Sequence, residues 1–383
     1  MAKKIICLEN LPYNANIRIG SHHYARIFSE SYDVLWISLP WHILQLLKDF
    51  KSDRIRNWNF NRPVRITQTL TAITPFICLP YRNNLLLRND FYIEHYYRFM
   101  PFLLHNIRRA GFTNPDIFWF TDPRHISILN YLEAKRIFYR CVDDLENFTD
   151  IPRSIVKYEY KLIEKSQAAF FTSLKLMEKF ENTNDTRIYL PNGCDFEFFN
   201  RKPNARKTDL ISHYFDFDKL NVLYIGTIAD WFDFQAIEHI ANDKGNNIII
   251  VGPVRTSIPE ACRNKNNVKF VGPYPYDMMP AFAHLADIGI IPFKVTEMTN
   301  AVNPIKLYEY SAAGLPTIAA NMKTLQTISG PFYIYDSYSD LPDIIREIAS
   351  KQKDLTFINK IIGFGRENSW RSRVSDIYKF FED

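Results

Sequence analysis

Two side chains of opposite charge, Lys306 and Glu309, stand three residues apart in the segment 303–316. Residues at this spacing lie on one face of a helix. A lysine in the first turn adds a full charge to the partial positive charge of the free backbone amides, a combination that binds phosphate. A carboxylate one turn deeper can accept hydrogen bonds from a pair of sugar hydroxyls. The pair predicts a diphosphate site beside a ribose site; the alternative is an ordinary ion pair on a solvated helix face.

The residues around this pair predict a short helix with both ends specified. Asn303 suits the N-cap, and Pro304 suits the first helical position, where no amide hydrogen is needed. Gly314 suits the position just past the last turn, and Pro316 prevents the helix from continuing. We therefore expect Asn303 and Lys306 together at the helix N-terminus.

Glycines follow two apolar runs that are expected to be buried strands of a parallel sheet. Gly226, followed by Thr227, ends the first run, and Gly252 ends the second. Glycine at the carboxyl end of a parallel strand lets the backbone approach a ligand closely, although many such glycines simply form turns. After the next run, Tyr274 or Tyr276 could stack on a base or could pack within the core.

Two carboxylates, Asp143 and Asp144, follow an apolar run in the first half of the chain. The carboxyl ends of parallel strands border the ligand site in such sheets, so Asp143 could deprotonate a hydroxyl as a general base. Aspartate is also a preferred N-cap residue, so either side chain could instead cap the following helix.

Further polar residues follow other expected strands of the first half. Arg18 and His22 lie in a loop after the first strand, and either could contact a phosphate or a hydroxyl. Asp122 and His125 follow the run 117–120 and are candidates for the same acceptor pocket. A histidine in such a loop can equally be a surface residue without a catalytic role.

The apolar runs fall into two sets separated by longer stretches with helical spacing, which predicts an α/β fold with two Rossmann-like domains. The expected strands are 5–8, 34–38, 76–79, 117–120, 137–142, 169–172, 188–190, 222–225, 248–251, 268–271, 288–291 and 317–320. A polar segment, 200–207, resembles a linker. We expect one domain at 1–200, a second at 201–360 and a terminal helical segment at 361–383.

The second-half motifs, taken in order, resemble the donor domain of a GT-B glycosyltransferase. They are Gly226-Thr227, Val251-Gly252-Pro253, Val271-Gly272, Asp287-Ile288-Gly289-Ile290-Ile291-Pro292-Phe293 and Pro304-x-Lys306-x-x-Glu309-Tyr310-x-Ala312-x-Gly314-x-Pro316. The resemblance implies an acceptor-binding domain at 1–200 and a donor-binding domain at 201–360, whose parallel sheets face each other across a cleft. It implies that Gly226, Thr227 and Gly252 line the nucleotide pocket, with Lys306 at the diphosphate and Glu309 at the ribose. Tyr274 and Asn303 are further candidates for contacts with the nucleotide.

Motifs of the first half extend this resemblance. The turn Pro191-Asn192-Gly193-Cys194-Asp195 is similar to the P-N-G-x-D turn that ends the first domain in many such enzymes. The segment 139–143 is similar to the Y-R-x-x-D of xanthan-type membrane-associated glucuronosyltransferases, which implies that Asp143 is the base of an inverting reaction. Ala301 stands where retaining members with an E-x7-E motif carry their first glutamate. The terminal helix around Trp370 is implied to pack back on the first domain.

The composition excludes several classes of protein. The chain has 383 residues, of which 46% are hydrophobic and 23% charged, so it is neither disordered nor limited to one small core. Its five cysteines are widely spaced, so neither a disulfide framework nor a zinc site is indicated. The sequence shows neither a signal peptide nor an apolar run long enough to span a membrane. A reducing, cytoplasmic location is expected.

The segment 48–109 is basic and rich in aromatic residues. It holds eleven Lys and Arg against four Asp and Glu, a net charge of +7, whereas the whole chain carries +5. Mixed cationic and aromatic side chains favour attachment to an anionic membrane surface. The alternatives are a solvated surface over a helical core, or RNA binding by the same chemistry. We favour the membrane and expect no nucleic-acid partner.

The resemblance, which is strongest to bacterial polysaccharide and teichuronic-acid glycosyltransferases, implies transfer of a sugar from a nucleotide diphosphate sugar, with a UDP-sugar favoured. The implied acceptor is a lipid-linked glycan at the inner face of the cell membrane. We expect no metal and no other cofactor, because Lys306 and the helix N-terminus would stabilise the leaving diphosphate. Two alternatives remain, an isomerase resembling the nucleotide-sugar 2-epimerases and a non-catalytic nucleotide-sugar-binding protein of an assembly.

Overall fold

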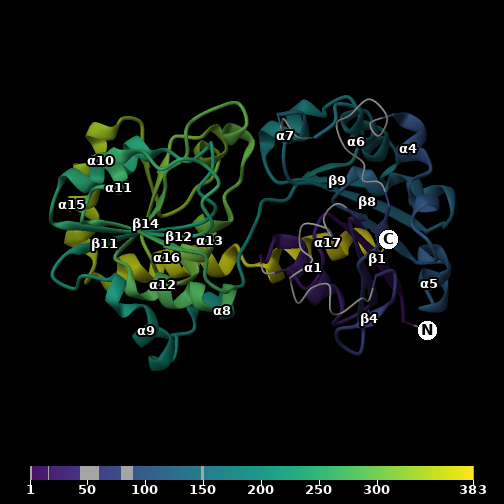
Figure 1. Ribbon diagram of the computed structural model, residues 1–383, viewed down its shortest axis with the longest axis horizontal. Coiled ribbons are helices and arrows are strands. Elements are labelled where there is room, and N and C mark those ends of the chain that lie inside the picture. The colour runs from purple at the N-terminus through teal and green to yellow at the C-terminus, as the bar shows by residue number, and fades with distance from the viewer. Residues whose placement is uncertain (1, 16, 44–59, 79–88, 148–150, 383) are drawn as a thin grey trace. The chain divides into compact units, whose positions relative to one another are not determined.

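A computed structural model describes residues 2–15, 17–43, 60–78, 89–147 and 151–382 (Figure 1). The chain divides into two compact units: unit 1 is Met1–Leu190 with Val374–Asp383, and unit 2 is Pro191–Arg373. The division precedes the polar segment at 200–207, because helix α8 (Phe196–Asn200) buries Phe196 and Phe199 in the core of unit 2. Several basic residues of the segment 48–109 lie outside the described residues, namely Lys48, Lys51, Arg54, Arg56, Arg82 and Arg88.

Unit 1 is built on a sheet whose strands run in the order β10-β9-β8-β7-β1-β2-β5-β4. The strands are β1 (Lys4–Glu9), β2 (Asp33–Ser38), β4 (Val64–Arg65), β5 (Leu70–Ile73), β7 (Ile117–Phe120), β8 (Arg136–Cys141), β9 (Ala168–Phe171) and β10 (Arg187–Tyr189). All neighbours are parallel except the edge pair β4 and β5. The strand order reverses between β1 and β7, so the carboxyl ends of these two strands mark the place where such sheets bind ligands.

Helices connect the strands of unit 1 as crossovers. They are α1 (Gly20–Phe28), α4 (Asp90–Glu94), α5 (Leu103–Arg109), α6 (Ser154–Lys165) and α7 (Leu174–Lys179), with 3₁₀ helices η1 (Tyr96–Phe99), η2 (Pro123–Asn130) and η3 (Leu145–Asn147). In the described residues, no helix combines the length and the apolar composition that crossing a bilayer requires.

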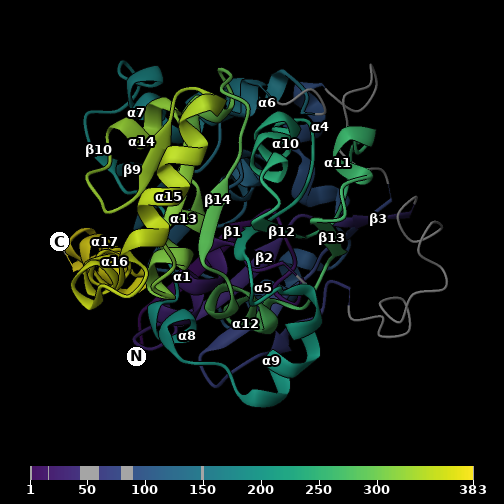
Figure 2. The ribbon, with the colours of Figure 1, turned by 90° about the vertical axis from the view of Figure 1, so that its left-hand side faces the viewer.

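Unit 2 has a wholly parallel sheet in the order β13-β12-β11-β14-β15-β16 (Figure 2). The strands are β11 (Leu220–Ile225), β12 (Asn246–Val251), β13 (Val268–Gly272), β14 (Ile288–Ile291), β15 (Thr317–Ala320) and β16 (Tyr333–Tyr335). In chain order this is 3-2-1-4-5-6, the arrangement of the Rossmann fold. Its reversal lies between β11 and β14.

Alternate residues of these strands face two separate cores. Leu223 and Ile249 belong to one cluster, whereas Val222 and Ile248 belong to the other, as the two-residue period of a strand requires. The helices of unit 2 are α8, α9 (Ala205–Ile211), α10 (Phe234–Asn242), α11 (Glu260–Arg263), α12 (Met279–Leu285), α13 (Ile305–Ala312), α14 (Lys323–Gln326), α15 (Leu341–Lys351) and α16 (Leu355–Glu367). Helices α12 and α13 cover the first cluster, and α10 and α15 cover the second.

The strand expected at 76–79 does not belong to the main sheet. Phe76 and Ile77 form the short β6, which pairs with β3 (Trp41–His42) in a separate ribbon, and Leu79 lies outside the described residues. The strand in this place of the main sheet is β5. It was not expected, because Thr71 makes its sequence less continuously apolar than that of the other strands.

The terminal segment contains two helices, α16 and α17 (Trp370–Glu382). They are separated because Cys194 accepts a hydrogen bond from Trp370 N (2.9 Å) and donates one to the Asn368 carbonyl (3.2 Å). Residues 361–373, expected to pack on the first domain, belong to unit 2, and only Val374–Asp383 belongs to unit 1.

Candidate functional site

Helix α13 begins one residue later than its sequence suggests. Pro304 is the N-cap, and the Asn303 side chain does not cap the helix but accepts a hydrogen bond from Asn192 N (3.0 Å). Gly314 has a φ of +76° just past the last turn, the left-handed conformation that ends helices readily at glycine. The expected N-cap role of Asn303 is therefore wrong, while the expected end of the helix is confirmed.

Lys306 and Glu309 form an ion pair on α13. The Lys306 side chain is 24% exposed and that of Glu309 is 5% exposed, so the pair does not lie on a freely solvated face. Tyr276 donates a hydrogen bond from its hydroxyl to Glu309 Oε1 (3.2 Å). The Glu309 carboxylate is thus held in a fixed position one turn behind the lysine.

Tyr310 fixes α13 against the sheet. Its hydroxyl accepts a hydrogen bond from Ile225 N (2.7 Å) at the carboxyl end of β11. A Cβ at Gly289, in β14, would lie 2.5 Å from the Tyr310 ring, so only glycine leaves room for it. The helix that carries Lys306 and Glu309 is therefore anchored where the strand order reverses. The motif at 304–316 contains Tyr310 but does not indicate this contact. The sequence feature that could have indicated it is Gly289, a glycine inside a buried strand.

Gly226 and Gly252 approach each other at the same end of the sheet. A Cβ at Gly252, whose φ is +149°, would lie 1.9 Å from the Gly226 carbonyl oxygen. Thr227 is half-buried, and its carbonyl accepts a hydrogen bond from the Tyr224 hydroxyl (3.0 Å). Since Tyr310 contacts Ile225, the residue before Gly226, the structure brings these glycines and α13 to one edge.

Of the two candidate tyrosines, Tyr276 lies at this site and Tyr274 does not contact Glu309. The Tyr274 hydroxyl is hydrogen-bonded to the Tyr214 hydroxyl (3.3 Å). The Tyr274 ring packs edge-on against Phe282, with 5.1 Å between the ring centroids. These contacts pack the half-buried Tyr274 against the core, as Tyr276 also packs. The expected role of Tyr274 at the nucleotide stays a prediction.

Asp143 and Asp144 follow β8 but have different surroundings. Asp144 is buried, forms an ion pair with Lys179 and accepts a hydrogen bond from Asn147 Nδ2 (2.8 Å). Asp143 is exposed, and its carboxylate has no hydrogen-bond partner in the described part of the chain. Surrounding protein atoms, and then Asp144, raise the pKa of Asp143, while Arg140 lowers it; because the residue is exposed, water limits this rise. Asp144 is thus held by the side chains of Lys179 and Asn147, and Asp143 is left able to accept a proton.

The two candidate histidines are buried and fully hydrogen-bonded. His22 Nδ1 accepts from Ile19 N (3.2 Å), and its Nε2 lies 3.3 Å from the Pro12 carbonyl. His125 contacts the Tyr97 hydroxyl (2.8 Å) and the Glu9 carbonyl (3.0 Å). Burial lowers the pKa of both histidines to about 4, so both are neutral at pH 7. His22 thus holds the loop between β1 and α1, and His125 holds the end of β1. Their expected role on the acceptor side stays a prediction.

The remaining acceptor-side candidates are also engaged. Arg18 donates to the Tyr13 carbonyl (2.7 Å) at the surface. Asp122 is buried, caps η2 through Arg124 N (2.9 Å) and forms an ion pair with the Arg124 side chain. Through these bonds Asp122 stabilises the loop after β7. Among the four acceptor-side candidates, Arg18, His22, Asp122 and His125, the exposed one is Arg18.

Two further carboxyls, those of Glu9 and Glu159, are buried. Glu9 ends β1 and accepts a hydrogen bond from the Thr121 hydroxyl; Glu159, on α6, accepts one from the Tyr139 hydroxyl (2.5 Å). Burial raises the pKa of each to about 7, against hydrogen bonds that lower it. Their burial is hard to predict from the sequence, because a glutamate on a helix or at a strand end is ordinarily exposed.

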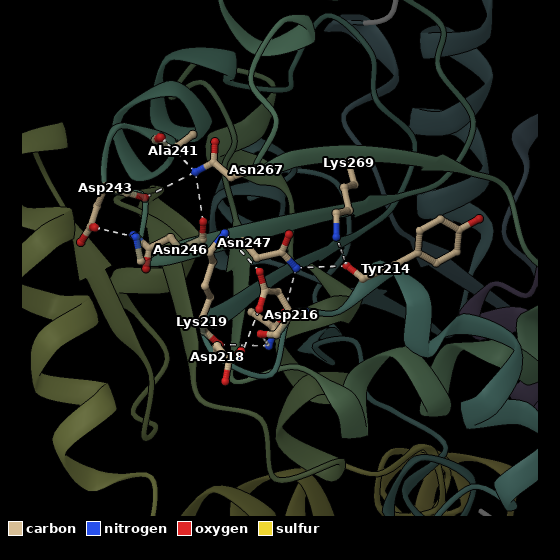
Figure 3. Close-up of polar contacts among 12 residues, drawn as sticks. Tyr214, Asp216, Asp218, Lys219, Ala241, Asp243, Asn246, Asn247, Asn267 and Lys269 are labelled. Atoms are coloured by element: carbon tan, nitrogen blue, oxygen red, sulfur yellow. Dashed lines mark hydrogen bonds and ion pairs between the residues drawn. The ribbon is translucent and has the colours of Figure 1, made fainter.

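The opposite edge of the unit 2 sheet carries a separate polar network (Figure 3). Asn247 Nδ2 donates to Asn221 Oδ1 (2.8 Å) and to the Tyr214 carbonyl (3.0 Å). A hollow of about 380 Å³ lies here, lined by residues that include Asn221 and Asp287. These residues precede or begin the strands, whereas the lysine and glycines above lie at the carboxyl ends, so this edge is distinct from the candidate site.

Across the described ranges, no three His, Cys, Asp or Glu side chains gather where they could hold a metal ion. The candidate site accordingly consists of a cation, a carboxylate and close-packed backbone.

Comparisons with known proteins agree with this geometry. Residues 219–350 match the family model described as glycosyl transferases group 1. Over 285 residues the chain is 24% identical to TuaH of Bacillus subtilis (strain 168), named as a candidate teichuronic acid biosynthesis glycosyltransferase, covering 68% of this chain and 70% of that one.

Solved structures resemble the whole chain at low sequence identity. Sucrose-phosphate synthase from Thermosynechococcus elongatus superposes with a TM-score of 0.69 at 12% identity, covering 99% of this chain and 98% of the other. A glycosyltransferase from Rickettsia africae gives 0.67 at 14% identity, with the same coverage. HepE from Anabaena, in complex with UDP and glucose, gives 0.65 at 12% identity and covers 100% of both chains. Residues 219–350 are therefore similar to a glycosyltransferase group 1 domain, within a chain that has the GT-B fold.

Proposed function

We propose that this glycosyltransferase transfers a sugar from a nucleotide diphosphate sugar, a UDP-sugar first among them, to a lipid-linked glycan in cell-surface polysaccharide synthesis. The observation that supports a nucleotide-sugar donor is the Lys306–Glu309 pair, which Tyr276 holds beside the close-packed Gly226 and Gly252. The UDP-bound HepE structures support the choice of base, and the name of TuaH supports the class of product.

A thermal-shift panel of UDP, GDP, ADP and dTDP, with their sugars, tests the donor. A ligand at 100 times its Kd should raise the free energy of unfolding by about 2.7 kcal/mol. We expect UDP and its sugars to stabilise the wild type and to lose this effect with Lys306→Ala. Lys219→Ala is the matched control, because Lys219 forms an i, i+3 ion pair with Asp216 (3.1 Å) at the opposite edge of the sheet. A panel without any shift, or equal losses in both variants, would count against this donor site.

For the reaction we propose inversion by direct displacement. The acceptor hydroxyl oxygen forms a bond to the anomeric carbon as the bond from that carbon to the diphosphate oxygen breaks. Asp143 takes the hydroxyl proton, and Lys306 with the first amides of α13 stabilises the charge on the departing diphosphate. Ala301 supplies no carboxylate for the double displacement that an E-x7-E motif would allow.

We further propose that the reaction needs no metal, since Lys306 stands where the leaving group carries its charge. Activity that persists in EDTA at the untreated rate would agree with this proposal. A rate that falls in EDTA and returns with Mg²⁺ or Mn²⁺ would contradict it.

The proposed membrane attachment has a candidate surface in unit 1. Three phenylalanines are exposed here: Phe91 in α4 (62%), Phe99 in η1 (39%) and Phe102, the residue before α5 (77%). Arg98 and Arg109 stand in the same stretch. Exposed rings beside cationic side chains suit the headgroup region of an anionic leaflet.

Phe102→Gly tests this surface with a built-in check on folding. Phe102 has a φ of +60°, which glycine adopts without strain, so the variant should be as stable as the wild type or more stable. We expect it to bind phosphatidylglycerol vesicles less tightly than the wild type, while both ignore phosphatidylcholine vesicles. Equal vesicle binding by both proteins, or binding of RNA in preference to vesicles, would contradict the membrane proposal.

Incubation of the UDP-sugar alone separates transfer from the two alternatives. An epimerase would convert the sugar nucleotide without an acceptor, and a binding protein would leave it unchanged even with one.

A further inference from the structure

The turn that opens unit 2 is hydrogen-bonded to the residue that leads into α13. Asn192 N donates to Asn303 Oδ1 (3.0 Å), and Asn192 Nδ2 donates to the Asn303 carbonyl (2.7 Å). Both residues are buried, at 5% and 2% exposure. Asn303 Nδ2 in turn donates to the Tyr308 hydroxyl (3.1 Å) on α13 itself. The backbone of Asn303 is thus fixed from two sides.

This fixed residue stands directly before the start of the donor helix. Pro304 follows Asn303, and Lys306 lies three residues beyond it. Proline has a locked φ and no amide hydrogen, so the direction in which the chain enters α13 is set by the residue before it. A shift of the Asn303 carbonyl therefore displaces the first amides of α13 together with Lys306.

The same turn ties together the two places where the chain passes between the units. One passage is at Leu190–Pro191 and the other at Arg373–Val374. Arg373 Nε donates to the Asn192 carbonyl (3.3 Å). A Cβ at Gly193 would lie 2.6 Å from the Asn368 carbonyl, so glycine is required for this approach.

We infer that Asn192 is a positioning residue for the diphosphate end of the donor site, acting through Asn303 on the N-terminus of α13. The inference rests on the proposed function, because it assigns the effect of Asn192 to the nucleotide. It also reassigns Asn303, which we expected at the nucleotide itself, as the residue through which Asn192 acts.

A double-mutant cycle tests this inference, with UDP as the probe. Asn192→Ala removes the side-chain donor, and a buried acceptor left without its partner is costly. We expect it to raise the Kd of UDP, measured by isothermal titration calorimetry, about tenfold. If the two asparagines act as one unit, Asn303→Ala should have a similar effect, and the double variant should be little worse than either single one.

Asn247→Ala is the matched control, because Asn247 is a buried asparagine whose side chain donates two hydrogen bonds at the opposite edge of the same sheet (Figure 3). It should lower Tm, as Asn192→Ala does, but leave the Kd of UDP within twofold of the wild type. Asn192→Asp keeps the size of the side chain but cannot donate to the Asn303 carbonyl, so it should also weaken UDP binding. The KM for the UDP-sugar should rise in the same order as the Kd values.

The outcomes separate the inference from the function on which it rests. If Asn192→Ala lowers Tm and leaves the UDP Kd unchanged, Asn192 is merely structural and the inference fails while the proposed function stands. If the effects of Asn192→Ala and Asn303→Ala simply add, Asn192 does not act through Asn303. If the wild type binds no nucleotide, the proposed function fails, and the inference fails with it.

Discussion

Glu159 is buried behind the strand that leads to Asp143. It accepts hydrogen bonds from the Tyr139 hydroxyl (2.5 Å) and the Cys141 thiol (3.5 Å), both on β8. Burial raises its pKa from 4.5 to about 7. Glu159 therefore binds a proton more tightly in the folded chain than in the unfolded one.

This raised pKa predicts a pH-dependent stability. Between pH 4.5 and about 7 the folded state holds more protons than the unfolded state, so the free energy of unfolding falls as the pH rises through this window. Glu159→Gln, which keeps the shape and stays neutral, should remove a fall on the order of 1–3 kcal/mol. Urea unfolding at pH 5 and pH 7.5 measures it. An unchanged difference between the two pH values would show that Glu159 is ionised throughout.

Asp143 carries the second prediction at this scale. Asp143→Asn should lower kcat for sugar transfer by about 10²- to 10⁴-fold, the usual effect of losing a general base, and leave the Kd of UDP unchanged. In the wild type, kcat/KM should fall as the pH drops through the raised pKa of Asp143, because the base must be ionised.

Asp144→Asn is the control for Asp143. It breaks the ion pair with Lys179, so it should cost stability rather than rate. Activity of Asp143→Asn equal to that of Asp144→Asn would remove Asp143 as the base.

At the scale of elements, α13 is held in place by α16 as well as by the sheet. A Cβ at Gly365, on α16, would lie 2.5 Å from Ala312 N, on α13. Helices that pack backbone to backbone tolerate no side chain at the contact. The position of the donor helix therefore depends on a glycine more than fifty residues away in the sequence.

Gly365→Ala should force the two helices apart. We expect a loss of about 1–3 kcal/mol in the free energy of unfolding, the usual cost of overpacking, together with weaker UDP binding. Gly363→Ala is the control on the same helix, because a Cβ there would have nothing within 4 Å. It should stabilise the protein by about 0.4–1 kcal/mol by reducing the freedom of the unfolded chain. Equal Tm values for the two variants would contradict this account of the contact.

At the scale of the whole molecule, the last residues of the chain complete the core of unit 1. Phe381, on α17, packs against three aromatic rings. The distance between ring centroids is 5.2 Å to Phe28, 5.3 Å to Phe138 and 6.1 Å to Trp119. Arg136, in β8, also donates to the Phe380 carbonyl (2.6 Å). The core of unit 1 therefore includes side chains from a segment that follows unit 2 in the sequence.

Phe381→Ala should cost about 3–5 kcal/mol in the free energy of unfolding, because it leaves a cavity among aromatic side chains. Urea unfolding followed by Trp fluorescence measures the change. Leu355→Ala should change stability by no more than about 0.5 kcal/mol, since Leu355 is 76% exposed. A midpoint for Phe381→Ala close to that of Leu355→Ala would show that α17 contributes little to unit 1.

The sequence was sufficient for the fold and for the contact between two of the candidate residues. Apolar runs such as 288–291 and 317–320 match β14 and β15 residue for residue, because strands buried on both faces are continuously apolar. The Lys306–Glu309 pair was predictable because three-residue spacing on a helix fixes which side chains meet. Strand β5 escaped because its polar Thr71 breaks the run.

Only the tertiary structure decided which residues far apart in the sequence would meet. Local spacing could not show that Tyr310 would bond Ile225, that Tyr276 rather than Tyr274 would reach Glu309, or that Asn303 would bond Asn192 instead of capping α13. Likewise, only the packing of distant segments showed that His22 and His125 are buried, which lowers the pKa of each to about 4. Periodicity records which face of an element is apolar, whereas the partner of a polar side chain depends on contacts that form when distant segments pack together.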